Sequence, residues 1–151
     1  MPEFVLGNQG RNGLNMSLSE RLKKHEGYET FPYPDPVKGY DAITIGVGHN
    51  LSANGLPDFI IDQLLDYDIG IARNELDRIH PEWRSYTPNR KDALTELMFI
   101  MGAPTLLSFK RMWGYIKTGD WAEAAVELLD SRFAEQVGQR AHTIADLLED
   151  G

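Results

Sequence analysis

The sequence predicts an α+β protein that is mostly helical, with one small antiparallel sheet close to its N-terminus. Residues 31–50 alternate apolar and polar side chains between Pro and Gly turns, a pattern typical of short strands. Residues 57–79 carry apolar side chains at helical spacing instead, and short amphipathic segments separated by helix breakers follow. We therefore expect a sheet-containing lobe, a long connecting helix and a helical lobe, with a cleft between the two lobes.

Residues 1–15 are rich in Gly and Asn and contain one short apolar cluster. That cluster is shorter than the core of a signal peptide and no basic region precedes it, so no signal peptide is expected. No stretch of the chain reaches the length of a membrane span, and stable membrane insertion is not expected. We expect residues 1–15 to be a flexible leader, or a segment that the native protein lacks, and residues 16–151 to form the folded domain.

The first helix is predicted to begin after Ser17 and to end near Glu26. Ser17 and Glu20 have the spacing of a capping box, in which each side chain accepts a hydrogen bond from the backbone of the other residue. Two leucines follow at helical spacing. Gly27 can take the left-handed conformation that closes a helix, so the helix should stop there.

The strands are predicted from Phe31 to about Asn50, with Gly39 in a turn. In the run from residue 42 to residue 47, Ile43, Ile45 and Val47 should share one face and Thr44 should lie on the other. Two glycines then interrupt the apolar run. Gly46 and Gly48 would allow the close approach of backbone or of a bound ligand.

His49 ends the last predicted strand and has two interpretations. It could act as a catalytic base, or it could be a structural residue bonded to an acid. We favour the structural role, with Asp68 as the acid.

The helical lobe is marked out by Pro, Gly and capping residues. The long helix should start near Pro57 and end before His80, and Thr87 with Pro88 should open the next helix, which Gly102 ends. Four more helices are predicted, from Pro104 to about Lys117, after Asp120, from Ser131 to Val137 and from Gln139 to Leu148. Five aromatic side chains are expected in the core of this bundle, Phe99, Phe109, Trp113, Trp121 and Phe133.

Composition limits the classes of function. The chain has 151 residues and 42% apolar side chains, enough for one sizeable core, and it has no cysteine for a disulfide framework. Asp and Glu outnumber Lys and Arg by 23 to 15, giving a net charge of −8. Such an acidic balance argues against nucleic acid as a partner, because nucleic acid binding depends on cationic contacts to phosphate.

Glu26 is an unusually placed carboxylate because it falls at the predicted end of a helix. The C-terminal end of a helix dipole is negative, and we expect nearby Leu22, Tyr28 and Phe31 to shield the carboxyl group from water. Both effects raise the pKa of a carboxyl group. A glutamate that stays protonated near neutral pH is suited to act as a general acid.

Asp35 and Thr44 offer complementary chemistry on the predicted sheet. Asp35 lies between Pro34 and Pro36, whose rings restrict the loop, and its carboxylate should stay ionised. Thr44 could direct its hydroxyl group into a cleft shared with Glu26 and hold a water molecule there. Each residue alone also has an ordinary explanation, as a solvated surface acid, a turn residue or a strand former.

Together these residues resemble the catalytic segment of the phage-type lysozymes, glycoside hydrolase family 24. The motifs of that segment occur in the family's order at Glu26-Gly27, Tyr33-Pro34-Asp35, Gly39-Tyr40 and Thr44 to His49. Motifs of the family's helical lobe follow at Met98 to Gly102, Leu106 to Phe109, Gly119 to Ala125, Asp130 to Phe133 and Gln139 to Ala141. Several motifs in a fixed order are more specific than one short pattern.

The resemblance implies a muramidase that hydrolyses the β-1,4 bond between N-acetylmuramic acid and N-acetylglucosamine. Glu26 would protonate the departing oxygen, while Asp35 and Thr44 would position the attacking water, with inversion at the anomeric carbon. Arg140 matches an arginine that faces the catalytic glutamate and orients it, and Gly46 would admit the substrate. Ile100 departs from the family, which commonly has Asn or Gln there.

The implied partner is bacterial peptidoglycan, with no metal and no cofactor, and we expect a monomer that lyses bacterial cells for a phage. The protein would stay in the host cytoplasm until its release to the periplasm or cell wall. Two alternatives stay open. One is a lytic transglycosylase, which would need no water site of Asp35 and Thr44. The other is a catalytically silent module that keeps the fold and binds the wall.

Overall fold

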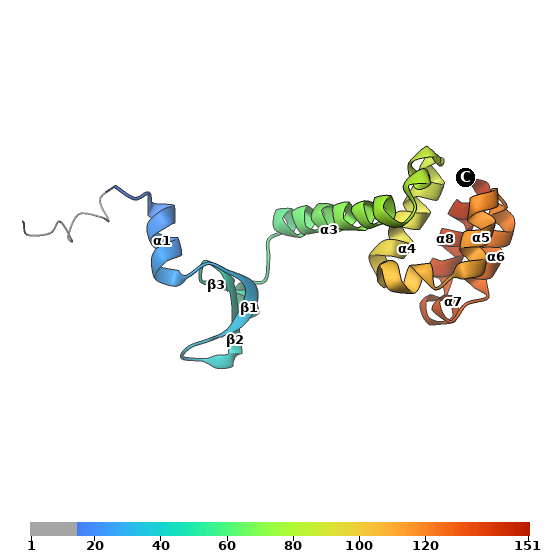
Figure 1. The fold of residues 1–151 in the computed structure, drawn as a ribbon. Helices are drawn as coiled ribbons and strands as arrows, with labels where there is room; N and C mark the ends of the chain where they lie inside the picture. The colour runs from blue at the N-terminus through green and yellow to red at the C-terminus, as the bar shows by residue number, and fades with distance from the viewer. Residues whose placement is uncertain (1–14) are drawn as a thin grey trace, which may run out of the picture. The chain divides into compact units, whose positions relative to one another are not determined.

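The computed structural model describes residues 15–151, and the chain divides into two compact units (Figure 1). The first unit ends at Ile60 and the second runs from Ile61 to Gly151. Helices and one three-stranded antiparallel sheet confirm the predicted α+β class. The predicted leader lies outside the described residues except for Asn15, and the cleft expected between two lobes stays a prediction.

The first unit contains one helix, the sheet and a single helical turn. Its elements are α1 (Leu18–Glu26), β1 (Glu29–Asp35), β2 (Gly39–Gly46), β3 (His49–Asn50) and α2 (Leu51–Asn54). The predicted capping box is confirmed, because the Ser17 hydroxyl accepts from the Glu20 N–H at 3.2 Å and the Glu20 carboxylate accepts from the Ser17 N–H at 2.7 Å. Gly27 follows α1 with φ 88°, a conformation that favours glycine.

The sheet has the strand order β1-β2-β3, so β1 is an edge strand. An edge position explains why β1 tolerates Pro32 and Pro34, since proline has no N–H to donate to a neighbouring strand. The strand β2 ends at Gly46, where φ is 68°. The prediction that Val47 continues the apolar face of this strand is therefore wrong, because the backbone leaves the extended conformation one residue earlier.

The long helix is present as α3 (Asp58–Ile79), and a short 3-10 helix, η1 (Pro81–Ser85), follows it. Side chains fix the C-terminal end of α3 to η1. Asp77 of α3 accepts a hydrogen bond from the indole of Trp83 at 2.8 Å and pairs with Arg84 at 2.6 Å. The boundary between the two units falls in the first turn of α3.

Five further helices complete the second unit, α4 (Pro88–Leu107), α5 (Lys110–Thr118), α6 (Trp121–Leu129), α7 (Arg132–Val137) and α8 (Gln139–Asp150). The predicted break at Gly102 is confirmed, with φ 74° and ψ 167° inside α4. The single helix predicted from Pro104 to Lys117 is wrong, since the chain leaves the helix at Ser108. There the hydroxyl and the N–H of Ser108 both donate to the Thr105 carbonyl, which replaces the helical hydrogen-bond pattern.

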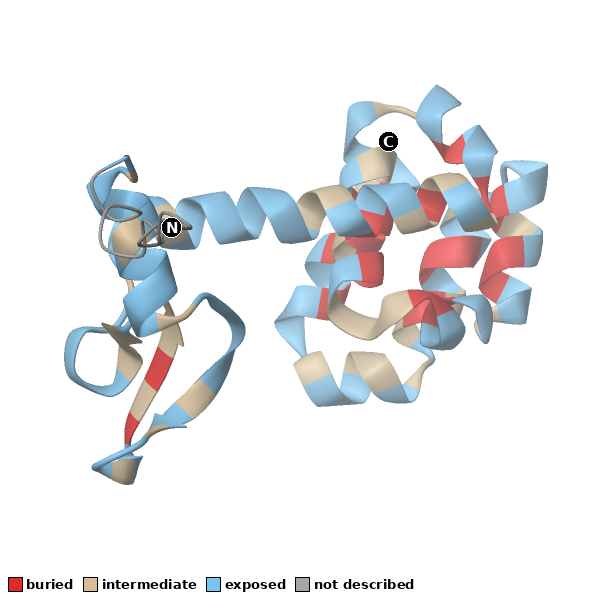
Figure 2. Ribbon diagram, turned by 60° about the vertical axis from the view of Figure 1, so that its left-hand side comes forward, coloured by how far each residue is buried: buried red, intermediate tan, exposed pale blue. Residues whose placement is uncertain are grey.

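Buried residues are concentrated in the helices of the second unit (Figure 2). The largest fully buried side chains all lie there: Leu76, Leu94, Leu97, Leu106, Met112, Ile116, Leu128, Ile144 and Leu148. Trp113 is buried as predicted, and Phe109, Trp121 and Phe133 pack against the core. Phe99 is 44% exposed, so its predicted place in the core is wrong. In the first unit, Ala42 and Thr44 are the buried residues among those described.

Candidate active site

Glu26 is the last residue of α1, and its carboxylate lies against the turn that follows β2. A Cβ atom built on Gly48 would stand 3.3 Å from Oε2 of Glu26, which is tighter than an ordinary contact. Gly48 also has φ +69°, a conformation that L side chains rarely adopt. Both reasons favour glycine at this position. The neighbour that approaches Gly48 is the side chain of Glu26, so the predicted approach of backbone or of a ligand stays a prediction.

The shielding predicted for Glu26 is not provided by the three side chains expected to give it. Leu22, Tyr28 and Phe31 are 43%, 65% and 80% exposed, and Glu26 itself is exposed. This prediction was wrong because the first unit has almost no core for these side chains to join. Glu26 is positioned by the end of a helix and a glycine turn rather than by an apolar pocket within its own unit.

Asp35 is the last residue of β1 and is held by a tight turn. Its Oδ1 accepts hydrogen bonds from the N–H groups of Val37 at 2.8 Å and Lys38 at 2.9 Å. The backbone N–H of Lys38, then that of Val37, hold the pKa of the Asp35 carboxyl group below its usual range. This direction agrees with the expectation that the Asp35 carboxylate stays ionised.

Thr44 occupies the central strand β2, between Tyr33 of β1 and Asn50 of β3. Only 6% of Thr44 is exposed, so its position is fixed by strands on both sides. Tyr33 precedes Asp35 by two residues on β1, and the sheet therefore brings the strand of Asp35 beside Thr44. The turn from β2 to β3 at the other end of the strand brings Gly48 to Glu26.

His49 opens β3 and pairs with Ile45 of β2. Its Nε2 donates a hydrogen bond of 2.5 Å to the carbonyl oxygen of Gly55, so the ring ties the end of the sheet to the loop after α2. A backbone carbonyl could not have been foreseen from a search for acidic partners. Gly46 has φ +68° with open space around its Cα, which leaves room for a ligand at that position.

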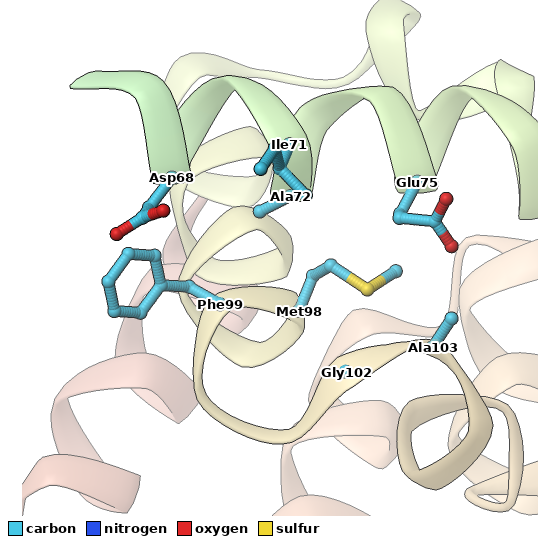
Figure 3. Close-up of a pocket in the computed structure, with 8 residues that line it drawn as sticks. All are labelled: Asp68, Ile71, Ala72, Glu75, Met98, Phe99, Gly102 and Ala103. Carbon is cyan, nitrogen blue, oxygen red and sulfur yellow. The ribbon is translucent and has the colours of Figure 1, made fainter. Parts of the chain in front are cut away.

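Asp68 belongs to the second unit, on α3, and lines a pocket of about 270 Å³ between α3 and α4 (Figure 3). The carboxylates of Asp68 and Glu75 lie toward opposite ends of this pocket, with Met98 between them (Figure 3). The ring of Phe99 lies beside Asp68 at the same pocket (Figure 3), where it remains exposed although an aromatic residue was expected in the core. The break at Gly102 lets the chain turn at the wall of the pocket.

Arg140 lies near the start of α8, where its Nε donates a hydrogen bond of 2.8 Å to Oε1 of Glu96 on α4. Glu96 could not be predicted from the sequence, since it stands 44 residues from Arg140 and no local pattern distinguishes it from a surface acid. Both side chains line a second pocket of about 270 Å³ with Phe99. Ile100 packs against the core of the helical unit.

Within residues 15–151, no three or more His, Cys, Asp or Glu side chains are grouped so that they could hold a metal ion. No helix in the same part of the chain is both long and apolar enough to cross a membrane.

The first unit thus carries a helix-end glutamate, and an aspartate and a threonine on a small antiparallel sheet, and a long helix and a helical unit follow. The family model described as Phage lysozyme matches residues 23–146, and the chain belongs to this family. The resemblance found in the sequence motifs is thereby confirmed. The protein is a lysozyme.

Relatives from two very different sources are similar to this chain. Probable T4-type lysozyme 2 and probable T4-type lysozyme 1 of Dictyostelium discoideum are 27% and 25% identical to it, each over 89% of this chain and 95% of the relative. The pre-baseplate central spike protein Gp5 of Enterobacteria phage T4 is 26% identical over 91% of this chain and 28% of Gp5. A sequence of this kind therefore occurs both as nearly a whole protein and as part of a longer one.

Proposed function

We propose that this lysozyme is a muramidase that hydrolyses the β-1,4 bond between N-acetylmuramic acid and N-acetylglucosamine in bacterial peptidoglycan. The observation that supports this most is the position of Glu26, whose carboxylate is held at the end of α1 against a turn where only glycine fits. A carboxyl group within hydrogen-bond reach of the departing oxygen is what proton transfer to that oxygen requires.

In this proposal Glu26 is the general acid, and Asp35 and Thr44 position the attacking water. The lowered pKa of Asp35 supports its role, since an ionised carboxylate can accept a proton from water. The fixed strand position of Thr44 supports a hydroxyl group that orients the water rather than one that reacts. No step of this reaction needs a metal or a cofactor.

Three other residues have supporting roles in the proposal. Arg140 orients the carboxyl group of the acid, and its hydrogen bond to Glu96 limits the directions in which its guanidinium group can point. His49 and Asp68 are structural, as expected from the sequence, and the bond from His49 to Gly55 supports that role for the histidine. His49→Asn should then lower stability more than specific activity.

The proposed reaction inverts the anomeric carbon, because a water molecule attacks the face opposite the departing sugar. Such a mechanism needs about 6.5–9.5 Å between the two carboxyl groups, whereas a retaining one needs about 5–5.5 Å. The anomer released first, followed by NMR during digestion, distinguishes the two. An α-anomeric product is expected from a β-1,4 linkage, and a β-anomeric product would contradict the role given to Asp35.

The setting that we propose is bacterial lysis by a phage, with the protein acting as a monomer once it reaches the cell wall. The similarity to a phage spike protein supports a phage setting.

Digestion of purified peptidoglycan by wild type and by Glu26→Gln, with mass spectrometry of the released fragments, tests the function. We expect hydrated reducing ends of muramic acid from wild type and a rate about 10²–10⁴ times lower from the variant. Glu123→Gln is the matched control, because Glu123 is an exposed acid on α6 to which the proposal assigns no role.

The other outcomes of this digestion identify other functions. Anhydro ends would mean a lytic transglycosylase. No release by either protein would indicate a silent wall-binding module, and wild-type turnover by Glu26→Gln would reject Glu26 as the acid.

A further inference from the structure

A groove on the helical unit is separate from every residue assigned above to the reaction. It consists of two adjoining cavities of about 550 and 260 Å³, which share Ile79, His80 and Lys117. One wall comes from the end of α3 and from η1, and the other comes from α5.

The base of the groove is a fixed polar and aromatic cluster around His80, of which 6% is exposed. Nε2 of His80 lies 2.6 Å from the hydroxyl oxygen of Tyr86, and Nδ1 lies 3.3 Å from a carboxylate oxygen of Glu82. The imidazole ring also packs on Trp113, with the ring centres 5.0 Å apart. The base of the groove is therefore an ordered surface, on which aromatic rings pack together and close polar contacts hold the polar atoms of His80, Tyr86 and Glu82 in place.

Two lysines lie along the α5 wall at positions that face the groove. Lys110 and Lys117 are seven residues apart, about 10.5 Å along a helix axis, and Gly114 lies between them on the same face. Lys117 is close enough to His80 that its ammonium group adds to the lowering of the histidine pKa, which burial causes first and Glu82 opposes. The two ammonium groups thus flank the aromatic floor.

Gly114 keeps the groove open between the two lysines. An exposed glycine inside a helix costs about 0.5–1 kcal/mol relative to alanine. Packing does not require it, because a Cβ atom at Gly114 would meet nothing within 4 Å. A residue without a side chain at this point leaves the helix backbone accessible between Lys110 and Lys117.

The side chains that line the groove carry more positive than negative charge, whereas the chain as a whole is acidic. The lining of the two cavities contains two lysines, Lys110 and Lys117, and one acid, Glu82, whereas the whole chain has 15 basic and 23 acidic residues. A ligand with carboxylates about two helical turns apart and small apolar groups between them would match both lysines and the Trp113 surface.

We propose that this groove binds the acidic peptide of peptidoglycan, a second contact with the substrate that rests on the proposed function. The carboxylates of the peptide pair with Lys110 and Lys117, and its aliphatic part covers Ile79 and Trp113. The contact attracts an acidic ligand to a chain whose net charge would otherwise repel it.

The test is an NMR titration of the wild-type chain with the synthetic tripeptide L-alanyl-γ-D-glutamyl-meso-diaminopimelic acid, whose carboxylates on successive residues can span the distance between the two lysines. The titration is followed at the Trp113 indole N–H and the His80 ring. We expect saturable shifts, and a Kd at least about tenfold weaker for Lys110→Gln with Lys117→Gln. The control is Lys91→Gln with Arg132→Gln, which removes the same charge from residues outside the groove and should leave the Kd unchanged.

Acetate is titrated separately to distinguish a peptide site from a general anion site. Equal shifts with acetate at the same carboxylate concentration would overturn the proposal, as would an absence of saturable shifts or an equal loss of affinity in both double variants. Binding of the free tripeptide does not depend on hydrolysis. Failure of the muramidase assay with intact tripeptide binding would therefore count against the proposed reaction and not against the groove.

Discussion

The sheet unit and the helical unit differ most in how much side chain they bury. The helical unit has one continuous core of leucine, alanine, methionine and tryptophan side chains. The sheet unit buries Ala42 and Thr44 among its described residues and leaves several large apolar side chains exposed. Yet the sheet unit carries all three residues to which we assign the chemistry.

This difference separates the sources of stability and of activity. Burial of apolar surface is the main favourable contribution to folding, so most of the folding free energy should come from the helical unit. The sheet unit is held by backbone hydrogen bonds, the capping box and glycine turns, which fix geometry without a large core. Substitutions in the two units should therefore affect different measurements.

The largest expected effect on stability comes from Leu94→Ala in the core of the helical unit. Leu94 is fully buried, and its truncation should lower the free energy of unfolding by about 2–5 kcal/mol through lost burial and a residual cavity. Urea denaturation measures this value. Specific activity of the folded variant should stay close to wild type, and a large loss of activity in fully folded protein would contradict the separation. Val126→Ala, at a residue 63% exposed, is the control and should change stability by less than about 0.5 kcal/mol.

A smaller loss of stability, with a distinct loss of activity, is expected from Gly48→Ala. The positive φ of Gly48 should cost about 1–2 kcal/mol, and the new Cβ should displace the Glu26 carboxylate and lower kcat about tenfold. Gly119→Ala has a similar φ of +80° with nothing within 4 Å of its Cβ. This control should lose comparable stability with unchanged kcat. An unchanged kcat in Gly48→Ala would show that the Glu26 contact has no catalytic importance.

The smallest effect is the pH dependence contributed by His80. Burial lowers the pKa of His80 below its usual 6.5, so the unfolded chain takes up a proton more readily than the folded one. The neutral, buried His80 ring therefore contributes to the free energy of unfolding in full above about pH 6.5. This contribution decreases as the pH falls from there toward the pKa of His80 in the folded chain. Between pH 7 and pH 5, thermal unfolding of wild type should therefore lose midpoint temperature faster than that of His80→Gln. Parallel curves for the two proteins would mean that His80 is not the group responsible.

Local signals in the sequence were sufficient for most element boundaries. Ser17 and Glu20 determine the start of α1 through bonds that span three residues, and Gly102 stops a helix because of its own backbone freedom. Local signals failed at Ser108, where a side chain competes with the helix for a carbonyl three residues away. They failed as well at Phe99, whose apolar character predicted burial although it lines an open pocket.

The residue types of the candidate site were determined by the sequence alone, because the order and spacing of Glu26, Asp35 and Thr44 can be recognised without any distance. Only the tertiary structure decided which groups surround them. The contact of Gly48 with Glu26, the bond from His49 to Gly55 and the pairing of Arg140 with Glu96 each depend on how separate segments fold together. The partner in each of these contacts is a carboxylate, a carbonyl or a glycine that is close in space but not marked by any local sequence pattern. Its position therefore follows only from the folded chain.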